Sequence, residues 1–482
     1  MKLAELLKGI PVLEFHADEA LEITGVSYDS RAAAPGNLFV AVRGYESDGH
    51  EYIGAAVKNG AACVLCEEKP EEDIPYILTD NTRRGLAVVS AVWFNNPASR
   101  LILVGVTGTN GKTTTTHLIK TLIEKCSGAK VGLIGTNYNM IGDRTVETER
   151  TTPESYELQK LFRDMADEGC TYAVMEVSSH ALFLDRVYGL TYEVGVFTNL
   201  THEHLDFHKT MDEYAKAKSL LFRQSNHAVV NLDDSYAGVM IGGATCPVFT
   251  FSTENDTADL VAKRIKVYPD KVDFCALTME KLQKIELNIP AIFSVYNALA
   301  AVAAGLQLGF ELEALAEAMK DCTGVKGRIE VVPTGRDFTV IIDYAHKPYA
   351  LENIISTFKE FAPGRVVTLF GCGGDRDATK RPLMGEIAAR LSDYVIVTSD
   401  NPRTEDPKKI IDDILVGMKG TKTPYIVIEN RREAIGWALK NAQSGDILIL
   451  AGKGHETYQI IGKEKFHFDE REVVREFLSA IS

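Results

Sequence analysis

The stretch "VGVTGTNGKTTTTHLIK", residues 104–120, decides how the middle of the chain folds. An apolar run predicts a buried strand, a glycine-rich turn follows it, and a helix begins after the turn. Glycines let the backbone curl so that its N–H groups face a phosphate chain. Lys112 can then reach the β and γ oxygens, and the Thr113 hydroxyl can hold Mg²⁺. The stretch therefore predicts ATP or GTP binding, with a plain glycine-rich turn as the alternative.

This turn departs from the strict phosphate-loop pattern at one position. The strict pattern has a glycine five residues before Gly111, where this chain has Val106, so the loop is the shortened GTNGKT form. The predicted nucleotide-binding residues of the loop are Gly108, Thr109, Asn110, Gly111, Lys112, Thr113 and Thr114.

Strand and helix patterns alternate on both sides of the loop, which predicts an α/β fold with doubly wound parallel sheets. The turn-rich segment "FNNPASR" (94–100) marks a boundary, and a second boundary lies near Ile329. We therefore expect three domains: a small mixed α/β domain over 1–98, a central phosphate-loop domain with a parallel sheet over 99–328, and a doubly wound α/β domain over 329–482.

Composition excludes several classes of function. A net charge of −15 argues against a nucleic-acid-coating surface. The N-terminus carries Glu5, Lys8 and Glu14, so it does not resemble a signal peptide, and the Ala-rich run 291–310 predicts a buried helix and no membrane span. Cys63 and Cys66 sit in an apolar run that predicts a buried strand more strongly than a redox pair. We expect a reduced, cytoplasmic protein, and a monomer.

A second polar cluster follows two further strands. Glu176 ends the strand pattern "AVME", and "TNLTHEHLDFH" (198–208) carries three histidines. His204 and His208 are four residues apart, which would suit zinc on one helical face, but Mg²⁺ beside a phosphate loop is the better hypothesis. Capping or packing is the favoured role for His202 and His208, and it stays an alternative for His204.

A first motif and eleven that follow it in order resemble the Mur ligase family, and the match spans nearly the whole chain. They are "YDSRAAAPGNLFVAVRG", "GTNGKTT", "TTPES", "EVSSHAL", "TNLTHEHLDFH", "YAKAKSLLF", "VYNALAA", "GRIE", "DYAHKP", "GCGGDRD" with "DNPR", and "GKGHE". The resemblance is greatest to the branch that adds the third residue of the peptidoglycan stem peptide.

This resemblance implies a UDP-binding domain, a central ATP-binding domain and a C-terminal Rossmann-like domain that binds the incoming amino acid. It implies that ATP phosphorylates the D-glutamate side-chain carboxylate of UDP-N-acetylmuramoyl-L-alanyl-D-glutamate, and that an amine then displaces phosphate. Residues implied around ATP beyond the loop are Asn297, Arg328, Asp343 and His346. Residues implied around the UDP-muramyl dipeptide are Ser30, Thr151, Thr152, Ser178 and Arg186.

The resemblance also implies two Mg²⁺ ions. Thr113 and Glu176 would serve the first, and His204 the second. Lys218 matches the family lysine that carries a carbamate, which turns an ammonium into an anion able to bind metal. Lys112, Lys218, His204 and Glu176 are thus the implied catalytic set. From the residues alone, Lys218 is one lysine on a helix, and Asp343 could simply cap a strand end.

The segment "VIVTSDNPRTEDP" (395–407) poses a question of its own. Arg403 stands among acids beyond the carboxyl end of a predicted parallel strand, where α/β sheets bind their ligands. By resemblance it reads the second carboxylate of meso-diaminopimelate, which L-lysine lacks. The full implied amino-acid site is Arg376, Asp400, Asn401, Pro402, Arg403, Gly452 and Glu456. The alternative is that Arg403 pairs with neighbouring acids on the surface.

Three other functions stay open at this point: the same ligation with L-lysine, a folylpolyglutamate synthase, and a nucleotide switch. The UDP-type first block and "DNPR" argue against the synthase, and the motifs of the third block argue against the switch. Three departures from related sequences concern the site: His202-Glu203-His204, Lys347 and Leu184.

Overall fold

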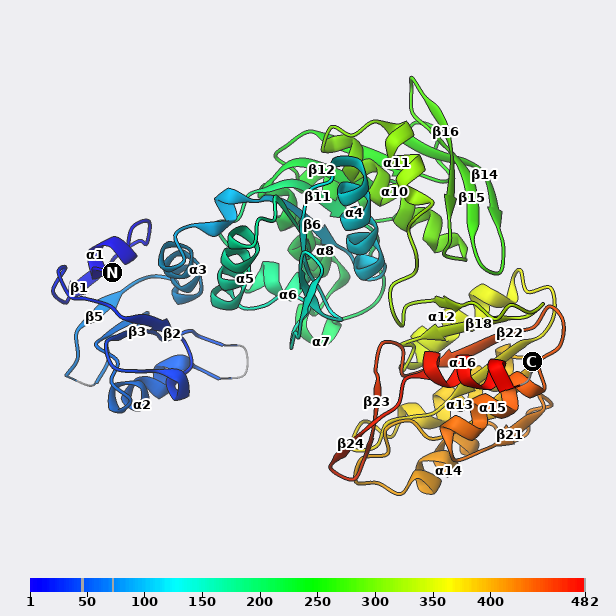
Figure 1. Ribbon diagram of the computed structural model, residues 1–482. Helices are drawn as coiled ribbons and strands as arrows, with labels where there is room; N and C mark the ends of the chain where they lie inside the picture. Colours follow the sequence, from blue (N-terminus) through cyan, green and yellow to red (C-terminus); the bar gives the residue numbers. More distant parts are fainter. Residues whose placement is uncertain (45–46, 72, 481–482) are drawn as a thin grey trace. The chain divides into compact units, whose positions relative to one another are not determined.

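The computed structural model describes residues 1–44, 47–71 and 73–480 (Figure 1). The chain divides into two compact units, Met1–Val261 with Leu299–Leu315, and Ala262–Ala298 with Ala316–Ser482. The predicted domain boundaries at 98/99 and 328/329 stay a prediction. No helix in the described ranges has the length and apolar character needed to cross a bilayer.

The first unit begins with a five-stranded sheet of order β1-β5-β4-β3-β2, parallel except for β1. Its strands are β1 (Glu14–His16), β2 (Gly25–Ser27), β3 (Asn37–Val40), β4 (Cys63–Cys66) and β5 (Tyr76–Leu78). Its helices are α1 (Leu3–Leu6), α2 (Ile53–Lys58) and α3 (Thr82–Trp93), with 3₁₀ turns Ser30–Ala32 and Gly49–Tyr52. The fully buried runs of β3 and β4 explain why the sequence shows no alternation there.

The cysteine prediction is confirmed. Cys63 and Cys66 are free, buried thiols within β4. Burial raises the pKa of each thiol to about 12, so neither has thiolate character at neutral pH.

The central sheet of the first unit has the strand order β13-β12-β11-β6-β10-β7-β8-β9. These strands are β6 (Ile102–Thr107), β7 (Val131–Ile134), β8 (Asn139–Ile141), β9 (Arg144–Val146), β10 (Tyr172–Glu176), β11 (Tyr192–Phe197), β12 (Ser225–Asn231) and β13 (Val248–Ser252). Strand β14 (Leu260–Val267) pairs with β13 in parallel through Leu260 and Val261. The strands from β13 to β7 are parallel, whereas β8 and β9 form an antiparallel edge.

Helices connect these parallel strands. They are α4 (Lys112–Ser127), α5 (Ser155–Asp167), α6 (Ser179–Phe183), α7 (Leu205–His208), α8 (Met211–Ser219) and α9 (Ala237–Gly243), with 3₁₀ turns Pro97–Arg100 and Leu220–Arg223. Later in the chain come the antiparallel pair β15 (Val272–Leu277) and β16 (Leu282–Leu287) and helices α10 (Ile292–Gln307) and α11 (Leu312–Met319). Side chains from Val295 to Ala304 in α10 are mostly fully buried, which confirms the predicted buried helix.

The second unit contains a six-stranded sheet of order β17-β18-β22-β19-β20-β21, in which only β17 is antiparallel. Its strands are β17 (Glu330–Val332), β18 (Thr339–Asp343), β19 (Val366–Phe370), β20 (Tyr394–Val397), β21 (Tyr425–Val427) and β22 (Ile447–Ala451). Its helices are α12 (Pro348–Lys359), α13 (Lys380–Leu391), α14 (Pro407–Gly417), α15 (Arg431–Lys440) and α16 (Glu470–Ala480). The hairpin β23 (Tyr458–Ile461) and β24 (Glu464–His467) follows β22.

This sheet is doubly wound, as predicted. Ile449 packs into a core with α12, α13 and α14, while its neighbours Leu448 and Leu450 pack into a second core with α15 and α16 (Figure 1). Helices therefore cover both faces, and the loops after β18, β19, β20 and β22 emerge at one edge. The predicted α/β fold with parallel sheets is confirmed, and short strands at the sheet edges, such as β1, β8, β9 and β17, pair antiparallel.

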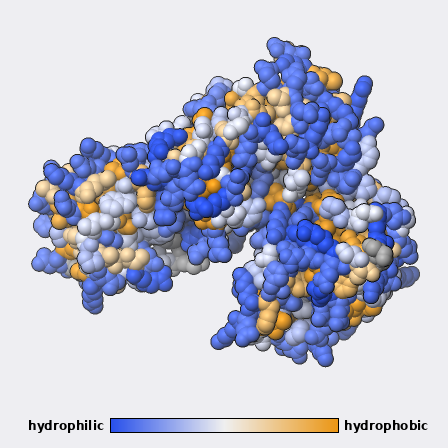
Figure 2. Space-filling view, in the orientation of Figure 1, coloured by the Kyte–Doolittle hydropathy of each residue, from blue (hydrophilic) through white to orange (hydrophobic). Residues whose placement is uncertain are grey.

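The face shown in Figure 2 is mostly hydrophilic, with scattered apolar side chains. Leu13, Phe183 and Met279 are among the large apolar side chains exposed to water.

Candidate functional site

The predicted phosphate loop joins β6 to α4. Gly108 and Gly111 have φ angles of +151° and +82°, which a side chain would strain. A Cβ on Gly108 would lie 2.0 Å from the Thr198 hydroxyl oxygen. The Nζ of Lys112 donates to the carbonyls of Gly108 and Thr109, each at 2.9 Å. The lysine is thus curled over its own loop at the amino end of α4, where helix N–H groups favour an anion.

Residues after β11 hold this loop in place, and the sequence did not reveal them. The side chain of Asn199 accepts from the Asn110 N–H at 2.9 Å, and its carbonyl accepts from the Thr109 N–H at 2.8 Å. The Thr198 hydroxyl donates to the Asn110 carbonyl at 2.7 Å. The motif "TNLTHEHLDFH" was expected to supply metal ligands; its first two residues shape the loop.

Two of the four predicted metal ligands meet directly. The Thr113 hydroxyl donates to the Glu176 carboxylate at 2.9 Å, and both side chains are buried. Thr136, beyond β7, also binds this carboxylate through its N–H at 2.9 Å and its hydroxyl at 3.0 Å. Thr113 and Glu176 offer the oxygen ligands that Mg²⁺ prefers, so the residues fit the predicted ion.

Lys218, the third predicted ligand, is 1% exposed on α8. Its Nζ donates to the Gly108 carbonyl at 2.8 Å and lies 4.6 Å from the centre of the Tyr214 ring. Burial, together with the nearby Lys112 ammonium, lowers the pKa of Lys218 well below its ordinary value. A buried amine beside a second cation is favoured in its neutral form, which is the form that reacts with electrophiles.

His204 is an exposed residue with a φ of +58° at the start of α7. Its ring centre lies 4.9 Å from that of His180 and 6.0 Å from that of Tyr214. Over the described ranges, no three or more His, Cys, Asp or Glu side chains are arranged to hold a metal by themselves. The role of His204 at a second ion therefore stays a prediction, in which phosphate oxygens and waters complete the shell.

The other two histidines of this motif behave as the packing hypothesis expects. His208 is 3% exposed, its Nε2 lies 2.9 Å from the Ser179 hydroxyl oxygen, and its ring stacks on Tyr214. Burial lowers the pKa of His208 to about 4. His202 is exposed.

Four of the five residues predicted for the UDP-muramyl dipeptide lie together next to Glu176. The Thr152 hydroxyl donates to the Glu176 carbonyl at 2.8 Å and accepts from the Ser178 N–H at 3.1 Å. Thr151 lies 3.0 Å from the Thr136 hydroxyl, and Nη1 of Arg186 donates to the Thr152 carbonyl at 3.3 Å.

Two details of this group differ from a simple anion site. Nε of Arg186 lies 2.8 Å from Glu154, an ion pair without the angle of a hydrogen bond, so a protein carboxylate already faces this arginine. Ser30 lies in the small sheet domain, within the 3₁₀ turn Ser30–Ala32, where its carbonyl accepts from Asn59. Within the described residues, no hydrogen bond joins Ser30 to the other four.

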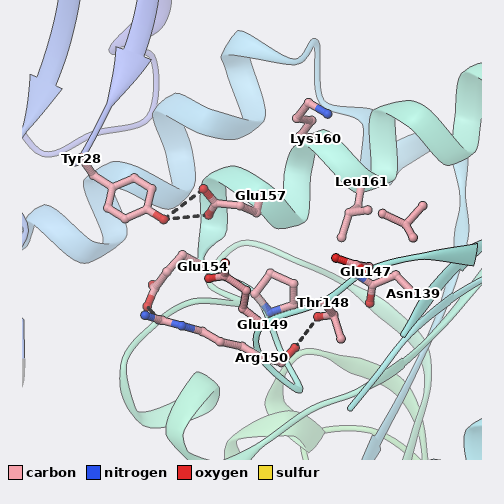
Figure 3. A pocket seen from close by; sticks show the side chains of 12 residues that line it. Tyr28, Asn139, Glu147, Thr148, Glu149, Arg150, Glu154, Glu157, Lys160 and Leu161 are labelled. Carbon is pink, nitrogen blue, oxygen red and sulfur yellow. Dashed lines mark hydrogen bonds and ion pairs between the residues drawn. The ribbon is translucent and has the colours of Figure 1, made fainter. Parts of the chain in front are cut away.

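A cavity of about 310 Å³ is lined in part by residues 146–150, which directly precede Thr151 and Thr152 in the chain (Figure 3). Figure 3 shows Tyr28 pointing at Glu157, whose two carboxylate oxygens it meets at 3.0 Å. The residues that line the cavity are Tyr28, Asn139, Val146, Glu147, Thr148, Glu149, Arg150, Pro153, Glu154, Glu157, Lys160 and Leu161. Four carboxylates against two cations do not suit a pyrophosphate, so we assign no anionic ligand to this cavity.

In the second unit, two of the residues predicted to surround the nucleotide, Arg328 and Asp343, lie near the end of β18. The Asp343 carboxylate accepts from the Ile329 and Ala345 N–H groups, each at 2.8 Å, which is the strand-end capping that the sequence left open. Burial raises the pKa of Asp343. The Arg328 guanidinium lies 5.3 Å from the centre of the Tyr344 ring, with its Nε buried and unbonded.

Two further residues predicted to lie near the nucleotide, His346 and Asn297, have surroundings that indicate less about their role. Nδ1 of His346 lies 2.8 Å from the Tyr344 carbonyl oxygen, and burial lowers the pKa of this histidine. Asn297 is 6% exposed on α10. Their roles at ATP, like those of Arg328 and Asp343, stay predictions.

Arg403 occupies an unusual position in the loop after β20. Its φ is +52°, its N–H donates to the Ile460 carbonyl at 3.1 Å, and its carbonyl accepts from the Gly462 N–H at 2.7 Å. Its Nη1 donates to the Gly374 carbonyl at 2.7 Å. No carboxylate in the described part of the chain lies within 4.0 Å of its guanidinium nitrogens. Surface pairing with neighbouring acids is therefore not its role here.

The acids predicted beside Arg403 face a different cation. Nδ2 of Asn401 donates to Glu456 at 2.9 Å. The Nζ of Lys453 lies 3.0 Å from Asn401 Oδ1, 3.2 Å from Glu456 Oε2 and 3.9 Å from Asp400 Oδ1. Gly452 has a φ of +111°, and a Cβ there would meet Asp400 Oδ2 at 2.7 Å. Lys453 was not predicted as a site residue.

The remaining two predicted residues of this cluster contribute less. Pro402 is buried, and its carbonyl accepts from the Glu405 N–H at 3.1 Å. Arg376 is exposed in the loop after β19, and within the described ranges its side chain makes one hydrogen bond, from Nη1 to the Asp375 carbonyl at 3.4 Å. This bond to its neighbour in the chain does not orient the guanidinium toward a ligand.

Comparison with known proteins agrees with this arrangement. Three family models match: the Mur ligase family catalytic domain over residues 22–98, the Mur ligase middle domain over 106–305, and the Mur ligase glutamate ligase domain over 327–454. UDP-N-acetylmuramoyl-L-alanyl-D-glutamate--2,6-diaminopimelate ligase of Caldanaerobacter subterraneus subsp. tengcongensis is 49% identical and aligns over 99% of both chains. The enzyme of the same name from Clostridium botulinum is 45% identical over the full length of both.

Solved structures give the same result. A structure of a UDP-N-acetylmuramoyl-L-alanyl-D-glutamate--2,6-diaminopimelate ligase, 33% identical, superposes with a TM-score of 0.76 over 100% of this chain and 99% of its own. MurF from Acinetobacter baumannii, at 18% identity and a TM-score of 0.61, shares the fold. Relatives this similar over the whole length, together with a matched model in each third of the sequence, show that the chain belongs to the Mur ligase family.

Proposed function

We propose that this chain is the ATP-dependent ligase that joins meso-2,6-diaminopimelate to the D-glutamate side-chain carboxylate of UDP-N-acetylmuramoyl-L-alanyl-D-glutamate. The observation that carries the proposal is the cluster at the carboxyl edge of the second sheet. Among the described residues, no carboxylate lies within salt-bridge distance of Arg403 there, while Asp400 and Glu456 present carboxylates on the loops after β20 and β22. Separated cationic and acidic groups suit the carboxylate and the ammonium of one amino-acid centre. The names of the full-length relatives support the same substrates.

The first step is phosphoryl transfer. A carboxylate oxygen of D-glutamate forms a bond to the γ-phosphorus of ATP, the bond to the β,γ-bridging oxygen breaks, and ADP leaves. Both reactants are anions, so cations must offset their repulsion, and Lys112 on the phosphate loop supplies one. Mg²⁺, when bound, neutralises charge on the phosphate oxygens; Thr113 and Glu176 would hold one ion, and His204 and Lys218 a second.

Lys218 fits that role only as a carbamate. Its neutral amine would add to CO₂ and release a proton, which replaces a potential cation by an anion. Complete burial and the lowered pKa favour the neutral amine that this reaction needs. As an ammonium, Lys218 would repel a metal ion.

The second step is amide formation. The unprotonated amine of diaminopimelate attacks the acyl carbon, the bond from that carbon to the phosphate oxygen breaks, and inorganic phosphate leaves with loss of a proton from nitrogen. Arg403 would bind the distant carboxylate, and Asp400 and Glu456 the amine beside it. L-lysine would instead bring an ammonium toward Arg403, which disfavours it.

The wider setting belongs to the same proposal. We place the reaction in the cytoplasm as part of peptidoglycan precursor synthesis, and we expect a monomer with domains 1–98, 99–328 and 329–482. The family models end and begin close to these boundaries, at residues 98, 106, 305 and 327.

The test is phosphate release with substrates omitted one at a time. We expect release that requires both the UDP-muramyl dipeptide and meso-diaminopimelate, and a product whose mass equals their sum minus water. Release without an amino acid would favour a nucleotide switch. Release that depends on a folate and glutamate would favour a folylpolyglutamate synthase. Either result would contradict the proposal.

A further inference from the structure

The cluster at the carboxyl edge of the second sheet is organised around Lys453, a residue that the proposed mechanism does not use. Lys453 follows β22 and Gly452 and is fully buried. Its Nζ contacts three side chains at once: Asn401 Oδ1 at 3.0 Å, Glu456 Oε2 at 3.2 Å and Asp400 Oδ1 at 3.9 Å. Asp400 and Glu456 are proposed above to bind the incoming amino acid, and Asn401 belongs to the same predicted site.

The Lys453 ammonium compensates the negative charge of the carboxylates around it. Two carboxylates share one ammonium, so the group carries one excess negative charge before any ligand binds. A single ligand ammonium would balance that charge. Without Lys453, the buried Asp400 and the largely enclosed Glu456 would lose the ammonium that compensates their charge, which is unfavourable away from water.

The surroundings keep the ammonium in one place. The aromatic rings of Tyr458 and Phe468 have their centres 5.9 Å and 6.0 Å from the Nζ of Lys453. Asn401 completes the arrangement, since its amide nitrogen donates to Glu456 and its oxygen accepts from both Lys453 and the Ile460 N–H. The lysine and Asn401 thus fix the Glu456 carboxylate from two directions.

We propose that Lys453 is a positioning residue for the incoming amino acid, which acts through Glu456 and Asn401 and sets the charge of the site to accept one ammonium. This inference rests on the proposed function, because it assumes that the cluster binds the amino acid. It does not require Lys453 to touch the substrate.

The test compares steady-state kinetics of the full-length wild type with Lys453→Met and Glu456→Gln. We expect Lys453→Met to raise the KM for meso-diaminopimelate by ~10- to 100-fold, while kcat and the KM values for ATP and the UDP-muramyl dipeptide change by less than about threefold. In a double-mutant cycle, Lys453→Met and Glu456→Gln should be clearly non-additive.

The matched control is Arg365→Met. Arg365 pairs with buried Asp446 at the opposite end of the strands, at 2.6 Å, so its loss weakens the same domain without touching the cluster. We expect this variant to lower the Tm and leave the KM for diaminopimelate unchanged. An equal rise in that KM for Arg365→Met and Lys453→Met would assign Lys453 a merely structural role.

A third variant covers the case in which Lys453→Met does not fold. Lys453→Gln with Glu456→Gln removes both charges together, which leaves no unpaired ion of that pair. Its KM for diaminopimelate should lie within about threefold of the Glu456→Gln value, and a KM tenfold higher would overturn the proposal. A wild type that does not use diaminopimelate would contradict the proposed function and this role with it. An active wild type with an unchanged Lys453→Met KM would contradict the role of Lys453 alone.

Discussion

Lys218 shows how one buried side chain links structure to chemistry. It is enclosed on α8, with Nζ on the Gly108 carbonyl. We expect Lys218→Ala to be nearly inactive in ligation and to be partly rescued by added short carboxylates, which replace the carbamate. The control is Lys216→Ala, because Lys216 lies exposed two residues earlier on the same helix and should tolerate the change. Full activity of Lys218→Ala would exclude the carbamate.

Arg403 carries the predicted discrimination between amino acids. Over the described part of the chain, its guanidinium has no carboxylate within salt-bridge distance and donates to the Gly374 carbonyl. Replacing Arg403 by alanine removes a charged hydrogen-bonding group, which is worth roughly 2–3 kcal/mol, so the KM for meso-diaminopimelate should rise by ~10²-fold. Arg390→Ala, which removes an exposed arginine on α13, should leave that KM unchanged. Equal effects of the two substitutions would show that Arg403 makes no specific contact.

Single residues also mark the limit of sequence reasoning. The place of Arg403 beyond a buried strand was predictable, because an apolar run followed by turn residues marks a strand end, while its role at a ligand stays a prediction. The burial of Lys453 was not predictable, because a lysine between two glycines carries no sign that its ammonium is buried among Asp400, Asn401 and Glu456. Those contacts arise only when the loops after β20 and β22 meet at the sheet edge.

At the scale of elements, the backbone of the loop after β22 lies so close to Asp400 that Gly452 leaves no room for a side chain. Gly452 has a positive φ, and an added Cβ would meet Asp400 Oδ2 at 2.7 Å. Gly462, in the turn of the β23–β24 hairpin, also has a positive φ but has open space around it. Both alanine variants should lose about 1 kcal/mol of stability from backbone strain. Only Gly452→Ala should also raise the KM for diaminopimelate, so similar KM values for the two would contradict this reading.

The packing of α6, α7 and α8 predicts a dependence of stability on pH. Burial lowers the pKa of His208 to about 4, below the ordinary value of 6.5. Between pH 6.5 and 4 the unfolded chain therefore binds more protons at this residue than the folded chain, and stability falls as pH falls through that window. His208→Gln should reduce the loss of urea midpoint between pH 7 and pH 5. His202→Gln, which changes an exposed residue of the same motif, should retain the wild-type loss.

Elements were the most predictable level of the structure. The apolar runs that form the strands β6, β18 and β20 were predictable, because a strand buried on both faces needs a nearly continuous run of apolar residues. The antiparallel edges escaped prediction, because short strands such as β8 and β9 depend on pairing with a neighbour that the sequence does not specify.

At the scale of the whole molecule, each unit supplies a different part of the proposed reaction. The first unit holds the phosphate loop, Glu176 and Lys218, and the second holds the amino-acid cluster around Arg403. Neither set suffices for ligation, because one activates a carboxylate and the other selects the amine that attacks it. The order of motifs along the chain predicted this division of chemistry, whereas the contacts within each set required the folded structure.

The most direct test of the account is the ratio of kcat/KM for meso-diaminopimelate to that for L-lysine, measured with the wild-type protein at saturating ATP and UDP-muramyl dipeptide. A site built to hydrogen-bond a carboxylate rejects an analogue that lacks it by ~10⁴-fold or more, and an ammonium facing Arg403 adds repulsion. We therefore expect a ratio of at least ~10³ in favour of diaminopimelate. Equal use of the two amino acids would contradict the assignment of Arg403 and, with it, the proposed substrate.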